Sequence, residues 1–184
     1  LKVGEYGKKV EVELEDGTRM KVNSTDCHPF NKSSLKRIVS DLTLLDDINA
    51  QLILHNLKKR FHKGEIYTNV GNILISINPY QRLPLYTKEV VKKYVTKPAG
   101  KEMPPHVFNI AHDSYYGVTA FEQLQSIVIS GESGAGKTEA TKQCLQYLAA
   151  VAGSVSGVDN KILMANPILE GFGNAKTLRN DNSS

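Results

Sequence analysis

The sequence has few cysteines and little excess charge. Its two cysteines, Cys27 and Cys144, lie far apart and share no metal-ligand spacing with the five histidines, so neither a disulfide framework nor a zinc site is expected. Lysine and arginine exceed aspartate and glutamate by only four, and the basic residues form no tract with interleaved aromatics. Nucleic-acid binding is therefore not expected, and the cysteine usage fits a reducing compartment.

Long hydrophobic runs are also missing. No stretch reaches the roughly 18 apolar residues that a membrane-spanning helix needs, and the start of the chain contains no apolar signal-peptide segment. These absences predict a cytoplasmic protein without direct membrane insertion. The chain of 184 residues is 40% hydrophobic and 23% charged, which suits one globular domain or a large piece of one. It opens with Leu1 instead of methionine and ends on a polar string, so we expect both ends to be cut from a longer chain.

Local patterns predict an alternation of helices and strands. Asp16 and Gly17 lie between two runs of alternating apolar and charged residues, which indicates a hairpin. Asp46 and Asp47 are expected to cap a helix with Ile48 on its apolar face. The expected elements are a hairpin over 8–24, a helix over 48–64, a strand over 67–80, helices over 87–95 and 106–121, a strand over 125–130, helices over 137–152 and 160–173, and a polar tail over 174–184.

The expected strand over 125–130, QSIVIS, is a short β-branched run of the kind that is buried on both faces of a parallel sheet. Helices that alternate with such strands indicate the α/β class with an open sheet. The chain contains no internal repeat.

The segment GESGAGKT, residues 131–138, follows that expected strand and precedes an expected helix. It satisfies G-x-x-x-x-G-K-[ST], the pattern of a phosphate-binding loop. Its glycines let backbone N–H groups approach a polyphosphate at the positive end of the helix, Lys137 supplies a mobile cation, and the Thr138 hydroxyl can ligate Mg²⁺. The expected nucleotide-binding residues are Gly131, Glu132, Ser133, Gly134, Ala135, Gly136, Lys137 and Thr138. Glu132, an anion in an anion-binding loop, is expected to point away from phosphate and to face another element. The loop predicts a nucleoside triphosphate with Mg²⁺, but neither the base nor the acceptor.

Two other polar loops follow apolar or helical segments. INPYQRLPLY, residues 77–86, can line the same crevice as the phosphate loop, because ligands of open α/β sheets bind beyond the carboxyl ends of the strands. Its residues either bind a purine base or form an ordinary proline turn. The tail over 174–184 offers Asn180, Asn182, Ser183 and Ser184, which either orient water and complete a Mg²⁺ shell or are simply solvated.

Four segments together resemble the motor domain of myosins. They are INPYQRLPLY, PPHVFNIAHDSYY, GESGAGKTEATKQCLQYLA and NPILEGFGNAKTLRNDNSS, and they occur in the order and approximate spacing of that family. The resemblance implies an incomplete P-loop NTPase-like fold, an open mixed sheet flanked by helices. Residues 1–32 would be the end of an SH3-like subdomain and a connector, and residues 33–184 the first part of the motor. Gly171, Asp181 and Ala140 depart from the commonest family residues, which leaves the myosin class open.

The resemblance also implies roles for single residues. Adenine contacts are implied for Asn78, Pro79, Arg82 and Tyr86 in the purine-binding loop. In the segment that matches switch I, Asn180 would contact phosphate, Ser183 would help to position the attacking water, and Ser184 would ligate Mg²⁺ beside Thr138. The implied catalytic residues are Lys137, Asn180, Ser183 and Ser184. Residues 151–159 would form the surface loop that affects nucleotide release.

The implied function is the ATP-binding portion of an actin-based motor that couples MgATP hydrolysis to force on actin filaments. Contacts with actin, and with light chains or calmodulin, would come from regions beyond Ser184, and cytoskeletal localisation follows only from the resemblance. Because switch II would also lie beyond Ser184, we expect the fragment alone to bind nucleotide weakly at most and to turn over no ATP. A nucleotide-binding piece without turnover and a small-molecule kinase remain the alternatives.

Overall fold

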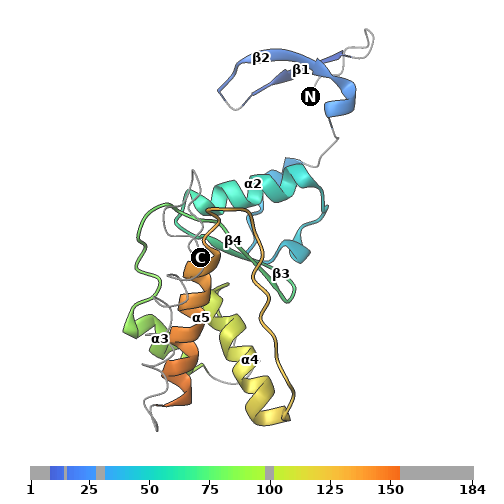
Figure 1. Ribbon diagram of the computed structural model, residues 1–184. Coiled ribbons are helices and arrows are strands. Elements are labelled where there is room, and N and C mark those ends of the chain that lie inside the picture. Colours follow the sequence, from blue (N-terminus) through green and yellow to red (C-terminus); the bar gives the residue numbers. More distant parts are fainter. Residues whose placement is uncertain (1–8, 15, 28–31, 98–101, 154–184) are drawn as a thin grey trace. The chain divides into compact units, whose positions relative to one another are not determined.

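The computed structural model describes residues 9–14, 16–27, 32–97 and 102–153 (Figure 1). The helix expected over 160–173 and the polar tail over 174–184 lie outside these residues. The chain divides into two compact units, Leu1–Lys36 and Arg37–Ser184. The domain boundary expected between residues 32 and 33 stays a prediction.

The first unit is built around one hairpin. Its elements are β1 (Lys9–Glu13), β2 (Arg19–Asn23), the 3-10 turn η1 (Ser24–Asp26) and the short helix α1 (Lys32–Lys36). The two strands are antiparallel, with Val10 opposite Val22. At the turn, Gly17 adopts φ +83° and the Asp16 carboxylate accepts a hydrogen bond from Thr18 N at 2.9 Å. The predicted hairpin is confirmed, whereas its origin in an SH3-like subdomain stays a prediction.

The second unit is mostly helical. Its elements are η2 (Leu42–Leu44), α2 (Ala50–Phe61), β3 (Tyr67–Val70), β4 (Ile73–Ser76), α3 (Lys88–Val95), α4 (Val107–Phe121) and α5 (Lys137–Ala152). The helices predicted over 87–95, 106–121 and 137–152 are confirmed. Local capping signals set the start of two of them, since Thr87 and His106 cap α3 and α4 with their side chains. No helix in the described part of the chain combines the length and the apolar character needed to cross a membrane.

The N-terminal end of α2 differs from the prediction. Asn49 caps this helix by accepting a hydrogen bond from Leu52 N at 2.9 Å. The Asp46 carboxylate instead pairs with Arg37 at 2.7 Å, and the Asp47 carboxylate accepts from the Asn49 side chain. The expectation that Asp46 or Asp47 caps the helix is therefore wrong, and Ile48 lies outside the helix with 63% of its surface exposed.

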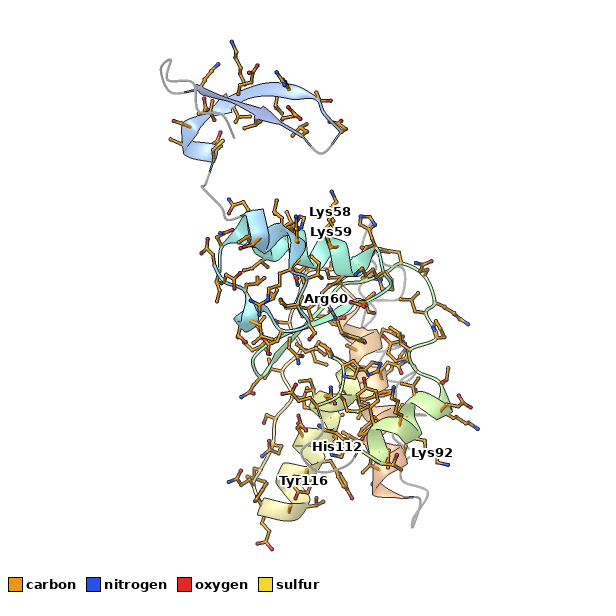
Figure 2. All side chains as sticks on the ribbon, turned by 180° about the vertical axis from the view of Figure 1, so that it is seen from behind. Lys58, Lys59, Arg60, Lys92, His112 and Tyr116 are labelled. Atoms are coloured by element: carbon orange, nitrogen blue, oxygen red, sulfur yellow. The ribbon has the colours of Figure 1, made fainter. Side chains whose placement is uncertain are left out.

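The stretch predicted as one strand over 67–80 is a hairpin of β3 and β4. Its turn contains Gly71, which adopts φ +58° and whose N–H donates to the Asp41 carboxylate at 3.2 Å. A single strand was expected because β-branched residues flank this glycine on both sides, but the positive φ reverses the chain. Arg60, labelled in Figure 2, ties α2 to this hairpin, because its guanidinium donates to Thr68 Oγ1 at 2.9 Å and to Tyr67 O at 2.8 Å.

The main core lies among β3, α3, α4 and α5. Its buried members are Ile66, Tyr67, Val91, Tyr94, Val107, Phe108, Ala111, Cys144 and Tyr147. Helices α4 and α5 lie side by side (Figure 1), and the rings of Phe108 and Tyr147 stack between them with centroids 5.0 Å apart. His112 Nδ1 lies 2.9 Å from the Tyr147 hydroxyl. This packing fixes the helix that carries the glycine loop.

Residues 125–130 do not form the predicted buried strand. Figure 1 shows extended chain between the end of α4 and the start of α5, and Leu124 and Val128 are 101% and 88% exposed. The prediction fails because a strand needs neighbours for its backbone N–H and C=O groups, and no described strand pairs with this segment. The described residues form a mixed α/β structure with two small antiparallel sheets; the predicted open sheet is not formed among them.

Candidate nucleotide site

The glycine loop enters α5 through three glycines with positive φ. The angles are +155° at Gly131, +80° at Gly134 and +95° at Gly136, a region that L side chains rarely adopt. A Cβ atom at Gly131 would also lie 3.1 Å from the Cβ of Ala135. Gly136 is the N-cap of α5 and, as a glycine, has no side chain to accept from the first N–H groups of the helix. These N–H groups and the positive end of the helix dipole therefore suit an anion.

Lys137 is exposed, and its ammonium group lies against the carbonyl oxygens of this loop. Its Nζ donates to Gly131 O at 2.8 Å and to Glu132 O at 3.0 Å. Thr138 follows in the first turn of α5 and is half-buried. A cation, a helix N-terminus and a hydroxyl thus lie within one turn of chain, which is the donor set that a polyphosphate requires.

The Glu132 side chain is exposed. The expectation that it faces another element stays a prediction. Its main chain has a local role instead, because Glu132 O accepts from Ala135 N at 3.1 Å and closes the turn of the loop.

The loop after β4 is fastened to the glycine loop by one side chain. Asn78 Nδ2 donates to Gly134 O at 2.8 Å, and Asn78 Oδ1 accepts from Tyr80 N at 2.8 Å. The side-chain carbonyl and one amide hydrogen of Asn78 are therefore both engaged in hydrogen bonds to the protein backbone. The structure brings the two sequence-predicted loops together, although 56 residues separate Asn78 from Gly134.

A pocket of about 390 Å³ lies beside this bond. All four residues that the resemblance assigned to the base line it, namely Asn78, Pro79, Arg82 and Tyr86. Glu139 of α5 also lines it and was missed, although its place in the first turn after Thr138 put it near the loop. Its carboxylate accepts from Gln143 Nε2 at 2.7 Å.

Tyr86 forms a fixed wall of this pocket. Its hydroxyl lies 2.6 Å from the hydroxyl of Tyr67 on β3. Burial raises the pKa of both phenols, so both keep their protons at neutral pH. The part of the pocket wall that Tyr86 forms is thus uncharged.

The remaining predicted site residues belong to the polar tail over 174–184. Asn180, Ser183 and Ser184 lie outside the described residues, so their roles stay predictions. Thr138 is the only predicted Mg²⁺ ligand within the described ranges, and no group of three histidine, cysteine or acidic side chains there could hold a metal ion. The described residues fit a polyphosphate, and the Thr138 hydroxyl is the group they offer to a magnesium ion.

Sequence comparisons identify relatives across almost the whole chain. The family model described as myosin head (motor domain) matches residues 39–184. The high molecular weight form of myosin-1 from Acanthamoeba castellanii is 54% identical over 184 residues, which is 97% of this chain and 11% of the relative. Myosin-1 from Neurospora crassa is 51% identical over 160 residues, 84% of this chain and 13% of the relative. Myosin-VIIa from Drosophila melanogaster is 46% identical over 182 residues, 99% of this chain and 8% of the relative.

The chain thus spans only about a tenth of the length of these curated relatives. Within that portion, the family match contains the glycine loop, the pocket beside it and the bond between Asn78 and Gly134. The predicted resemblance is confirmed, and the chain belongs to the myosin head (motor domain) family.

Proposed function

We propose that this chain is the ATP-binding portion of an actin-based motor. The observation that carries the proposal is the Asn78–Gly134 bond, which joins a phosphate cradle to a pocket of about 390 Å³. A triphosphate in the cradle would leave its base beside this pocket. Pro79 and Tyr86 offer apolar surface for the ring, and Arg82 offers a planar cation that can stack on it. Membership of the myosin head family supports adenine as the base and actin as the partner.

The chemistry proposed for the complete protein is hydrolysis of MgATP by in-line attack of water. The loop N–H groups and Lys137 bind the β- and γ-phosphates, and Asn180 also contacts phosphate. Thr138 and Ser184 would hold Mg²⁺, which neutralises charge on the phosphates when it is bound. Ser183 helps to position the water. The state of the γ-phosphate then changes actin affinity through the loop that carries Asn180.

The proposed fold is a P-loop NTPase-like open sheet that later sequence completes. Two observations support it. Residues 125–130 are extended and unpaired among the described residues, and a cavity of about 350 Å³ separates them from the β3–β4 hairpin. A strand from sequence after Ser184 would pair with this segment. Amide hydrogen exchange on the full-length protein tests this, because residues 125–130 are then expected to be protected; rapid exchange there contradicts it.

The proposed surroundings of the complete protein follow from the same family membership. It would act in the cytoplasm in association with the cytoskeleton, with light chains or calmodulin bound outside this portion. The portion alone is expected to bind nucleotide weakly and to show no turnover, since hydrolysis needs contacts from residues beyond it.

The test is steady-state Mg-ATPase activity of the full-length protein with and without actin filaments. We expect actin to raise the rate, and Ser183→Ala to slow hydrolysis more than it weakens ATP binding. ATP binding without any turnover would favour a nucleotide-binding pseudo-enzyme. Phosphate transfer to a small molecule, without a response to actin, would favour a kinase.

A further inference from the structure

The imidazole of His106 contacts both α4 and the loop that lines the predicted base pocket. His106 is the N-cap of α4 and is 4% exposed. Its Nδ1 accepts a hydrogen bond from Phe108 N at 3.1 Å, and its Nε2 lies 3.1 Å from Leu85 O. A carbonyl oxygen can only accept, and a backbone N–H can only donate. The neutral tautomer with hydrogen on Nε2 therefore satisfies both partners at once.

The same ring packs against the wall of the pocket. Its centroid lies 5.7 Å from that of Tyr86 and 5.0 Å from that of Tyr67, whose hydroxyls are 2.6 Å apart. Leu85, which receives the Nε2 hydrogen bond, directly precedes Tyr86. His106 thus holds the C-terminal end of the 77–86 loop through both the main chain and a side chain, while Asn78 holds its N-terminal end on Gly134.

His106 does not line the pocket that contains Arg82 and Tyr86. It lines a separate cavity of about 380 Å³, together with Arg60, Tyr94 and Leu85. A base in the proposed site would therefore contact Tyr86 without contacting the imidazole. The contacts that lead from His106 to this pocket are those with Leu85 and Tyr86.

We infer that His106 is a positioning residue for nucleotide-base recognition, because it fixes Leu85 and Tyr86 so that Tyr86 presents a preformed wall to the base. This inference rests on the proposed nucleotide function and deepens it. Loss of the Leu85 bond leaves the phosphate cradle in place but lets the base-binding loop move. The contribution of the base to binding is then reduced, whereas the contribution of the phosphates is retained.

The variant His106→Asn separates this role from helix capping. An asparagine at the N-cap keeps an acceptor for Phe108 N–H, but its side chain is too short to span both Phe108 and Leu85. The readout is the affinity of the full-length protein for MgATP divided by its affinity for magnesium tripolyphosphate, which has no base. We expect His106→Asn to lower this ratio about tenfold, the loss typical of one hydrogen bond, with little change in tripolyphosphate affinity.

Asn49→Ala is the matched control, since it removes the side-chain cap of α2 away from the pocket. It should lower stability and leave the ratio unchanged. A ratio that stays at the wild-type value in folded His106→Asn overturns the inference. Equal losses of both affinities also overturn it, because they indicate a purely structural role.

Tyr67→Phe tests the same connection if His106→Asn does not fold, because it deletes only the hydroxyl that contacts Tyr86. A few-fold lower ratio is expected, and an unchanged ratio overturns the inference. Wild-type protein that binds ATP no better than tripolyphosphate overturns the base pocket of the proposed function itself. The two failures are therefore distinguishable.

Discussion

The side-chain amide of Asn78 donates to the main-chain carbonyl oxygen of Gly134 at 2.8 Å, while its carbonyl oxygen accepts from Tyr80 N. Asn78→Asp keeps the acceptor for Tyr80 and replaces the donor with a carboxylate oxygen that faces the Gly134 carbonyl. We expect the free energy of unfolding to fall by about 1–3 kcal/mol and nucleotide affinity to fall about tenfold or more. Chemical denaturation and nucleotide titration measure the two effects.

The control for Asn78→Asp is Gln51→Glu, at an exposed residue in the first turn of α2. It carries the same change of charge without the link to the glycine loop. Asn78→Leu separates loss of the donor from the added charge. Unchanged nucleotide affinity in both Asn78 variants would show that the bond does not couple the two loops.

Lys137 provides a second prediction. Lys137→Ala removes the ammonium group that lies over Gly131 and Glu132, and an exposed cation of this kind adds little to stability. We expect the affinities for MgATP and for tripolyphosphate to fall by about 100-fold or more, because charge-assisted hydrogen bonds to phosphate are lost. Lys92→Ala, at an exposed lysine on α3 (Figure 2), is the control and should change neither affinity. Similar mild effects in both variants would contradict the assigned role.

Gly136 permits a comparison with a glycine outside the site. Gly136 and Gly64 have φ values of +95° and +76°, and a Cβ atom at either would meet no other atom within 4 Å. An alanine at each position therefore costs backbone strain alone, about 1–2 kcal/mol. We expect similar losses of stability in Gly136→Ala and Gly64→Ala by urea unfolding, but loss of nucleotide affinity only in Gly136→Ala. A Gly136→Ala protein with wild-type affinity would rule out a need for this loop geometry.

His106 predicts a loss of stability in mild acid. Burial lowers the pKa of His106 to about 4, against an ordinary value of 6.5. The phenols that pack on it, Tyr67, Tyr86 and Tyr94, stay neutral because burial raises their pKa. As the pH falls below 6.5, the unfolded chain takes up the proton before the folded chain does. The stabilising contribution is therefore complete above pH 6.5 and declines down to about pH 4, by up to about 3 kcal/mol.

The measurement is the free energy of unfolding between pH 7.5 and pH 4 for the wild type and for His106→Asn. The variant should lose less stability across this range, because it lacks the titrating imidazole. Asn49→Ala, which removes the side-chain cap of α2 and no titrating group, should keep the wild-type slope. Parallel curves for wild type and His106→Asn would contradict the lowered pKa.

The parts of the fold that were predicted correctly depend on neighbouring residues. Gly17 fixes the first hairpin through its own backbone conformation, and Thr87 caps α3 with its own side chain. The wrong predictions concern residues whose partners lie farther along the chain. Asp46 forms an ion pair with Arg37, and Asn49 is the cap of α2. Residues 125–130 stay largely exposed, because no described strand pairs with them.

The candidate site shows the same division. The loop motif predicts roles for Lys137 and Thr138 because their chemistry depends on consecutive residues, and the family resemblance implies roles for Arg82 and Tyr86. Neither indicated the role of His106, which depends on a contact with Leu85 across 21 residues. Such a contact exists only after the 77–86 loop has folded against α4. A histidine beside a proline pair has no local signature for that role.

The exposed segment between α4 and α5 affects how the protein is made. Leu124 and Val128 lie in an extended stretch that no described strand covers, and in the proposed fold a strand from later sequence has to be synthesised before it can pair there. We expect the uncovered stretch to bind chaperones and to start aggregation during that interval. We therefore expect the yield in a cell to depend on the rate of translation beyond α5, and a charged residue at position 124 to change solubility during synthesis.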